Sequence, residues 1–173
     1  MKHKGFREES TVIDGGKTMK YYDGGISVVN VRLVNEGRIG GEEKIVMPMQ
    51  AVKLIGREIA DLAREAVYVI NLDIRGRVLS IHLAGLGMTT GTYISGKEIF
   101  LPALLANAAS IIIVHNHPGQ DSTPSQTDAE FTLMMSDIGE MLGIRVDDHI
   151  IISGGDPDNY YSFTNERLQT SKT

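Results

Sequence analysis

Residues 111–128 read IIIVHNHPGQDSTPSQTD. The first four are β-branched and apolar, which is typical of a short strand that is buried on both faces. This run ends in His115 and His117, two of the five histidines in the chain. Side chains at positions i and i+2 of an extended chain point to the same side, so both imidazoles can reach one metal ion. The stretch therefore predicts a buried strand with a metal site at its end.

A carboxylate from the next element can complete the ligand set. Asp128 follows His117 at the point where the sequence predicts the start of a helix. A catalytic zinc takes three protein ligands and keeps a fourth position for water, so we expect His115, His117, Asp128 and a water. The ligand types favour zinc but leave iron, manganese and cobalt as alternatives.

Each of these residues also has a plainer explanation. A single histidine at a strand end is more often structural than a ligand. Ser125 and Asp128 have the spacing of a helix N-cap and its acidic partner. The two roles are compatible, since a capped helix start would hold Asp128 in place. The combined spacing, rather than any one residue, favours a metal site.

Composition restricts the other classes of function. The chain has 173 residues, 42% of them apolar, which suits one well-buried domain. It has no cysteine, which excludes disulfides, thiolate ligands and a cysteine nucleophile. The net charge of -5 lacks the basic footprint of a nucleic-acid-binding domain. The charged N-terminus and the absence of a long apolar run predict a soluble, cytoplasmic protein with no membrane span.

Apolar spacing and turn residues predict an α/β fold with a central sheet. Residues 1–47 are interpreted as a Gly-rich N-terminal arm with a strand or hairpin at Ile26–Val34, and residues 48–173 as the main domain. Within that domain we expect a helix from Pro48 to about Arg64, a hairpin turning at Asp73–Gly76, helices over 97–110 and 128–143, and strands over 111–117 and 145–155.

The pattern H-N-H-P-x6-S-x2-D, over residues 115–128, resembles the metal motif of the JAMM (JAB/MPN-plus) metalloprotease family, and within it the RadC-like branch. The similarity extends over about residues 48–165, through AREAVYVINLD, KEIFLPALLANAASIIIVHNHP and DDHIII followed by YSF. It implies the MPN fold, a cytidine-deaminase-like mixed sheet flanked by helices. RadC proteins usually carry a helical DNA-binding-like module upstream, whereas this chain has a Gly-rich arm, which weakens the case for a DNA-repair role.

The resemblance also implies roles for individual residues. His115, His117 and Asp128 would bind one zinc ion per chain. Glu65 would be the general base that takes a proton from the zinc-bound water, and Ser125 would hydrogen-bond the oxyanion. Only the family match distinguishes Glu65 from Glu58. Three further polar residues are expected to be structural: His82 and His149 in the sheet, and Glu98 in the first turn of a helix.

The implied function is cleavage of an amide bond in a peptide or protein substrate, as a metallopeptidase or isopeptidase. Loops around 85–96 and 118–124 would form the substrate groove. The HNH nucleases spread their signature over a longer segment, and zinc deaminases need cysteines that this chain lacks. Two alternatives stay open: a non-catalytic MPN-type scaffold and a DNA-repair-associated accessory protein. The oligomeric state is not determined by the sequence.

Overall fold

The computed structural model describes the backbone at residues 8–13, 17–22, 32–40, 44–87, 94–119 and 121–165, and side chains from residue 32 onward within these ranges. Contacts divide the chain into two compact units, Met1–Arg32 and Leu33–Thr173. Each unit is described by itself. The predicted boundary between arm and domain at residue 48 stays a prediction.

The first unit contains a two-stranded antiparallel sheet. Strand β1 (Glu8–Ile13) pairs with β2 (Lys17–Tyr22), with Glu8 opposite Tyr22. We expected the strand or hairpin of this region at Ile26–Val34. Residues 26–31 lie outside the described part of the chain, and residues 32–34 are not in a strand. The observed hairpin therefore precedes the predicted strand.

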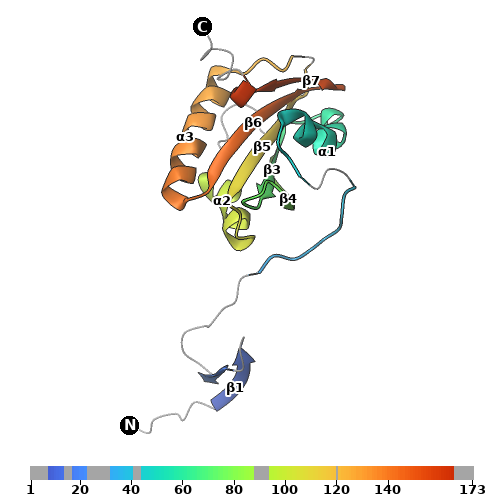
Figure 1. Cartoon of the computed structure of the whole chain (residues 1–173). Helices are drawn as coiled ribbons and strands as arrows, with labels where there is room; N and C mark the ends of the chain where they lie inside the picture. Colours follow the sequence, from blue (N-terminus) through green and yellow to red (C-terminus); the bar gives the residue numbers. More distant parts are fainter. Residues whose placement is uncertain are drawn as a thin grey trace, which may run out of the picture. The chain divides into compact units, whose positions relative to one another are not determined.

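The second unit is a mixed sheet flanked by helices (Figure 1). Its five strands lie in the order β4-β3-β5-β6-β7. Only β5 and β6 are parallel, and α3 makes the crossover between them, while the other neighbours are antiparallel. The elements of this unit are α1 (Pro48–Ala60), β3 (Ala66–Leu72), β4 (Val78–Leu86), α2 (Gly96–Leu105), β5 (Ser110–His117), α3 (Gln126–Leu142), β6 (Arg145–Ser153) and β7 (Asp156–Ser162).

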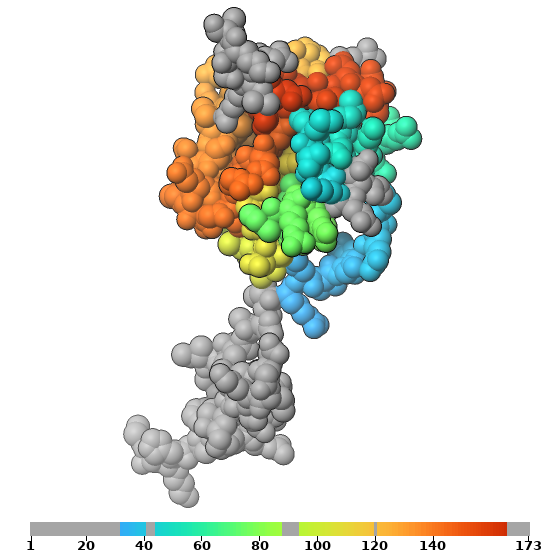
Figure 2. All heavy atoms as spheres, viewed as in Figure 1, coloured from blue at the N-terminus to red at the C-terminus, as the bar shows by residue number. Residues whose placement is uncertain are grey.

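Strand β5 lies at the centre of the sheet and is covered on both faces, as the sequence predicted. Val114 and Ile112 point to the side of α1, where they pack with Ile55 and Ile59. Ile113 points to the other side, where it packs in a cluster with residues of α2 and α3. In the space-filling view, α1 and α3 both lie at the surface of the domain (Figure 2). The helices thus cover both faces of β5. Apart from Ser110 at its start, the polar side chains of the strand lie at its C-terminal end, at residues 115–117.

Several predicted elements were confirmed with shorter or shifted ends. Helix α1 stops at Ala60 rather than near Arg64, and α2 stops at Leu105 rather than at residue 110, where β5 already begins. The turn at Asp73–Gly76 is confirmed, with Gly76 at a φ of 75°. Helix α3 ends at the predicted cap, Gly143, whose φ is 69°. Strand β7 was not assigned from the sequence.

Glu98 lies in the first turn of α2, as expected, where its carboxylate accepts a hydrogen bond from the Ser95 amide at 3.1 Å. Among the described helices, none is both long and apolar enough to cross a membrane. The second unit has a mixed α/β architecture, a five-stranded sheet flanked by helices, as the predicted fold class requires.

Candidate metal centre

The three predicted ligands come together at the C-terminal end of β5. His115 and His117 point to the same face of the sheet, and Asp128 lies in the first turn of α3, which covers that face. The His115 side chain is 6% exposed, that of Asp128 17% and that of His117 20%. The cluster is therefore closed on the His115 side and accessible on the side of the other two residues.

The ligand atoms have the spacing that a metal ion requires. The Nε2 atoms of His115 and His117 are 3.1 Å apart. Asp128 places one carboxylate oxygen 3.4 Å from Nε2 of His115 and the other 3.5 Å from Nε2 of His117. Ligands of a tetrahedral zinc, bound at about 2.0–2.1 Å, lie roughly 3.3 Å from each other. The donor set, two imidazoles and a carboxylate, also suits zinc, so these residues fit the ion that the sequence predicts.

The orientation of His117 is set by a backbone carbonyl. Its Nδ1 atom lies 3.0 Å from the carbonyl oxygen of Asp121, which can only accept a hydrogen bond, so Nδ1 carries the proton. In the neutral ring, Nε2 therefore carries the lone pair that can bind a metal ion, and in the protonated ring Nε2–H can donate to Asp128. The Asp128 carboxylate raises the pKa of His117, against the effect of burial and with smaller contributions from the Asp121 carbonyl and the charge of Glu65. A site that stabilises a proton on Nε2 of His117 also stabilises a metal cation bound to that nitrogen.

Asp128 is fixed by the helix cap that the sequence predicted. The Ser125 hydroxyl and the Ser125 amide both donate to one carboxylate oxygen of Asp128, at 2.6 and 2.7 Å. The Asp128 amide donates to the Ser125 hydroxyl oxygen at 3.2 Å, which closes the capping box. Burial alone would raise the pKa of Asp128, but the contacts with the imidazoles of His115 and His117 and the hydrogen bonds from Ser125 outweigh it and hold the pKa well below its usual range. Asp128 is therefore an anion facing two imidazoles.

Glu65 lies next to this cluster, immediately before the first residue of β3. The antiparallel register pairs Val67 with His115, and continuing it by two residues puts Glu65 opposite His117. Glu65 is half-buried, and its charge raises the pKa of His117. Its backbone carbonyl accepts a hydrogen bond from Gly87 at 2.7 Å. Glu58, the competing glutamate, is exposed on α1.

Asn116, between the two histidines, holds the segment that carries Glu65. It points to the opposite face of the sheet and is fully buried. Its side-chain oxygen accepts from the Ala66 amide at 2.8 Å, and its NH2 group donates to the carbonyls of Leu62 and Arg64, both at 3.2 Å. One three-residue stretch thus fixes the two imidazoles and the backbone on both sides of Glu65. Asn116 was not assigned from the sequence, because its partners lie some fifty residues away.

Two further features of the site were missed. The buried His149 was expected to be a packed strand residue, and it is, but its Nε2 atom lies 2.8 Å from Nδ1 of His115. Gly154 follows β6, and its amide donates to the carbonyls of His117 and Gly119 at 2.8 and 2.9 Å. Both contacts depend on the β5–β6 register, which pairs His117 with Ser153 and which the sequence alone does not reveal.

The other polar residues near the site have structural contacts. The Ser122 hydroxyl donates to the side chain of Asn159 at 3.1 Å, and Asp121 accepts from the Thr123 amide at 2.8 Å. The loops predicted to form a substrate groove fall partly outside the described residues, at 88–93 and at 120.

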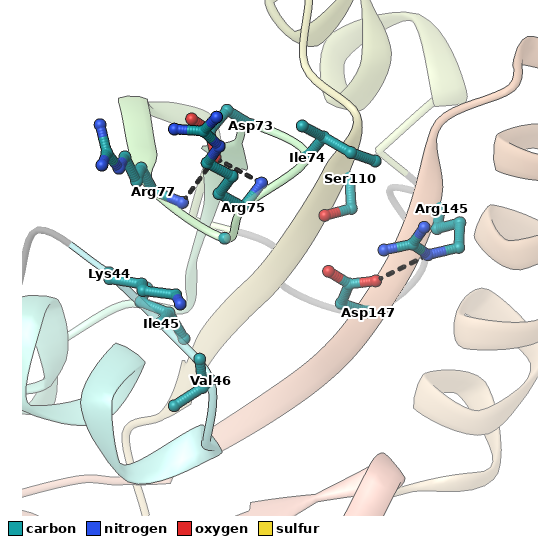
Figure 3. Close-up of a pocket in the computed structure, with 11 residues that line it drawn as sticks. Lys44, Ile45, Val46, Asp73, Ile74, Arg75, Arg77, Ser110, Arg145 and Asp147 are labelled. Carbon is teal, nitrogen blue, oxygen red and sulfur yellow. Dashed lines mark hydrogen bonds and ion pairs between the residues drawn. The ribbon is translucent and has the colours of Figure 1, made fainter.

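A separate hollow of about 510 Å³ lies at the opposite end of the sheet (Figure 3). Ser110, the first residue of β5, lines it, whereas His117 is the last, so roughly 20 Å separate the two places. None of the predicted site residues lines it. Both acidic side chains that line it already have partners. Asp73 accepts hydrogen bonds from the amides of Arg75 and Arg77, and Asp147 forms an ion pair with Arg145 at 3.2 Å. The hollow is thus distinct from the metal centre.

A mixed sheet between helices, with two histidines at the end of its central strand and an aspartate capping the next helix, defines a domain of the JAB/MPN class. The model of the family described as RadC-like JAB domain matches residues 45–168, and the chain belongs to that family.

Curated relatives agree with this assignment. The UPF0758 protein TTE0897 of Caldanaerobacter subterraneus is 34% identical over 116 residues, covering 67% of this chain and 50% of the relative. A UPF0758 protein of Pelobacter propionicus is 36% identical over 126 residues, covering 73% of this chain and 54% of the relative. One from Clostridium perfringens is 39% identical over 109 residues, with coverages of 63% and 48%. The chain spans about half the length of these relatives.

Proposed function

We propose that this chain is a zinc-dependent hydrolase of amide bonds, a metallopeptidase or isopeptidase, with one zinc ion per chain. The observation that carries the proposal is the spacing of the His115, His117 and Asp128 ligand atoms, 3.1–3.5 Å, in a cluster that is closed on one side only. A scaffold that only binds partners has no need for an accessible set of ligands. Zinc held here would supply Lewis-acid chemistry, which lowers the pKa of water toward about 7 and polarises a carbonyl group.

Glu65 is the general base in this proposal. The β3–β5 register, continued from Val67, puts Glu65 opposite His117, and in this proposal its carboxylate reaches the accessible side of the cluster. There it can accept a proton from water and later return that proton to the leaving amine. Its backbone is held on both sides by Asn116, so the chain delivers this carboxylate from a fixed segment rather than from a free loop.

Ser125 is the proposed donor to the oxygen that becomes negative when the amide carbonyl is attacked. Its hydroxyl has one proton, which Asp128 accepts in this structure. Donation to a substrate therefore requires the hydroxyl to rotate away from Asp128, whose oxygen keeps its bond to the Ser125 amide. A preorganised donor contributes about 3 kcal/mol to transition-state stabilisation, and the Ser125 hydroxyl would contribute less, because it must first leave Asp128.

The substrate would be a peptide or a protein whose scissile amide reaches the side on which His117 and Asp128 are exposed. The experiment uses purified protein with zinc, fluorescence-quenched peptides, and peptides joined through a lysine side chain. We expect about one zinc per chain by elemental analysis, lost in His117→Ala and in Asp128→Ala. We expect cleavage by the wild type and by Glu58→Gln, the exposed control, and none by Glu65→Gln.

The outcomes separate the alternatives. A wild type that binds no zinc would overturn the metal site and with it the hydrolase. Zinc binding without cleavage of either amide type would favour the scaffold. Equal cleavage by wild type and Glu65→Gln would reject the role of Glu65.

A further inference from the structure

The non-ligating nitrogen of His115 begins a chain of hydrogen bonds that returns to another predicted ligand. His115 Nδ1 lies 2.8 Å from His149 Nε2, on the neighbouring strand β6. His149 Nδ1 lies 2.6 Å from the hydroxyl of Thr132 on α3. That hydroxyl lies 2.6 Å from the backbone carbonyl of Asp128, one turn earlier in the helix. The path links His115 to Asp128 through two side chains.

The direction of every bond in this chain follows from its last member. A backbone carbonyl only accepts, so the Thr132 hydroxyl gives its proton to Asp128. The Thr132 oxygen must then accept from Nδ1 of His149. A neutral His149 that is protonated on Nδ1 has a bare Nε2, which accepts from Nδ1 of His115. His115 is thereby the Nδ1–H tautomer, with its Nε2 lone pair directed at His117 and Asp128.

Packing keeps this chain in one arrangement. His149 is 1% exposed and Thr132 is 4% exposed, so water does not compete for either. The His149 ring is stacked on Phe163, with centroids 5.1 Å apart and planes 6° apart. Phe131 meets the same ring edge-on at 5.7 Å. With the ring clamped by two aromatic side chains, its nitrogens cannot exchange places by rotation without displacing core residues.

We propose that His149 and Thr132 are positioning residues of the metal centre: through them, the Asp128 backbone carbonyl fixes the tautomer of His115, so that its Nε2 is a ligand before any ion arrives. The proposal depends on the proposed function only in that the three side chains bind a metal. Partners of this kind set the tautomer and basicity of metal-binding histidines, and their loss typically weakens metal affinity by about 10–100-fold.

Thr132→Val is the variant that breaks the chain with the least change in shape. Valine keeps the branched volume but can neither accept from His149 nor donate to Asp128. His149 can then carry its proton on Nε2 and donate to His115, which forces the His115 proton onto the nitrogen that should bind the metal. Thr132→Ser keeps the hydroxyl. Ser136→Ala is the matched control, because Ser136 makes the same type of bond, to the Thr132 carbonyl at 2.9 Å, one turn further along α3.

The first test needs no metal. Nitrogen-15 NMR of histidine-labelled, metal-free protein reports which ring nitrogen of each histidine carries the proton. We expect Nδ1–H for both His115 and His149 in the wild type. An Nε2–H tautomer at His115 would overturn the proposal, whether or not the protein binds zinc or cleaves amides.

The second test measures zinc affinity by competition with a chromophoric chelator. We expect binding to weaken by about 10–100-fold in Thr132→Val and to be close to wild type in Thr132→Ser and Ser136→Ala. Thr132→Ala serves in the same way if the valine variant does not fold. Wild-type affinity in a folded variant that lacks the hydroxyl would overturn the proposal. Absence of zinc binding by the wild type would instead reject the metal site, and the NMR result would still decide the tautomer.

Discussion

The side-chain oxygen of Asn116 accepts a hydrogen bond from the backbone amide of Ala66 at 2.8 Å, although the two residues are fifty positions apart. The same side chain binds the carbonyls of Leu62 and Arg64. Asn116 therefore joins the strand that bears the histidines to the segment that bears Glu65. The relative position of the predicted ligands and the proposed base depends on one buried amide group.

Replacing Asn116 should weaken both the domain and this junction. Asn116→Ala leaves the buried Ala66 amide and the less buried carbonyls of Leu62 and Arg64 without their partner, and we expect a loss of about 1–3 kcal/mol in the free energy of unfolding. Urea denaturation measures it, and hydrogen exchange at the Ala66 amide should become faster. Asn71→Ala is the control, since Asn71 is equally buried but binds only the side chains of Ser80 and His82, through its NH2 group, while its side-chain oxygen has no partner among the described residues. An equal loss in both variants would contradict the special role of Asn116.

Gly154 should be intolerant of a side chain. A Cβ atom there would lie 2.4 Å from the carbonyl oxygen of Pro118 and 2.9 Å from that of His117, and backbone atoms cannot move aside as a flexible side chain does. We expect Gly154→Ala to lower the free energy of unfolding by about 1–3 kcal/mol and to weaken zinc binding by displacing His117.

Gly119→Ala is the control, because a Cβ atom at Gly119 meets nothing within 4 Å. It should change stability by less than about 0.5 kcal/mol. Similar thermal unfolding curves for the two alanine variants would show that the turn after β5 is more adaptable than its contacts suggest.

Zinc should stabilise the folded protein by mass action. At a zinc concentration one hundred times the dissociation constant, the gain is about 2.7 kcal/mol, which raises Tm by about 5–10 °C for a domain of this size. Asp128→Asn should lose most of this shift, whereas Asp137→Asn, exposed on the same helix, should keep it. Differential scanning calorimetry with and without zinc chloride gives the comparison, and an unshifted Tm in the wild type would count against the site.

His82 should make stability depend on pH. Burial lowers its pKa, partly offset by the Glu98 carbonyl, 3.2 Å from Nε2. The folded state then binds the proton less tightly than the unfolded state. The free energy of unfolding therefore has its full value above about pH 6.5 and declines as pH falls below it. Burial lowers the pKa of His149 as well, with the same sign. We expect the free energy of unfolding of His82→Gln, measured by urea denaturation, to decline less steeply than that of the wild type between about pH 6.5 and 5. Parallel stability curves for the two proteins would contradict this.

The sequence predicted the elements that depend on local signals. The run Ile111–Val114 was predicted to be a strand buried on both faces, and the Gly76 and Gly143 turns were placed correctly because only glycine adopts their φ angles easily. The predicted C-terminal ends of α1 and α2 lie beyond the observed ends, which are Ala60 and Leu105. Residues 61–65 have helical composition, but Asn116 binds the carbonyls of Leu62 and Arg64 and draws this segment toward β5.

For the site, spacing and resemblance identified the three clustered residues, since His115 and His117 share one strand and Asp128 shares a capping box with Ser125. Apart from Ser125, the residues that hold this cluster in place were not identified from the sequence. His149, Thr132 and Gly154 act through the pairing of β5 with β6 and the packing of α3 on it, and neither the register nor the packing is encoded in a local pattern.

The position of β5 in the middle of the sheet also bears on local unfolding. Edge strands β4 and β7 each have a single neighbour, so they can fray while β3, β5 and β6 stay paired. The backbone amides of His115 and His117 would therefore be among the slowest in the domain to exchange their hydrogens with solvent. Transient opening at the rim of the sheet would admit water or a partner chain without displacing the two imidazoles.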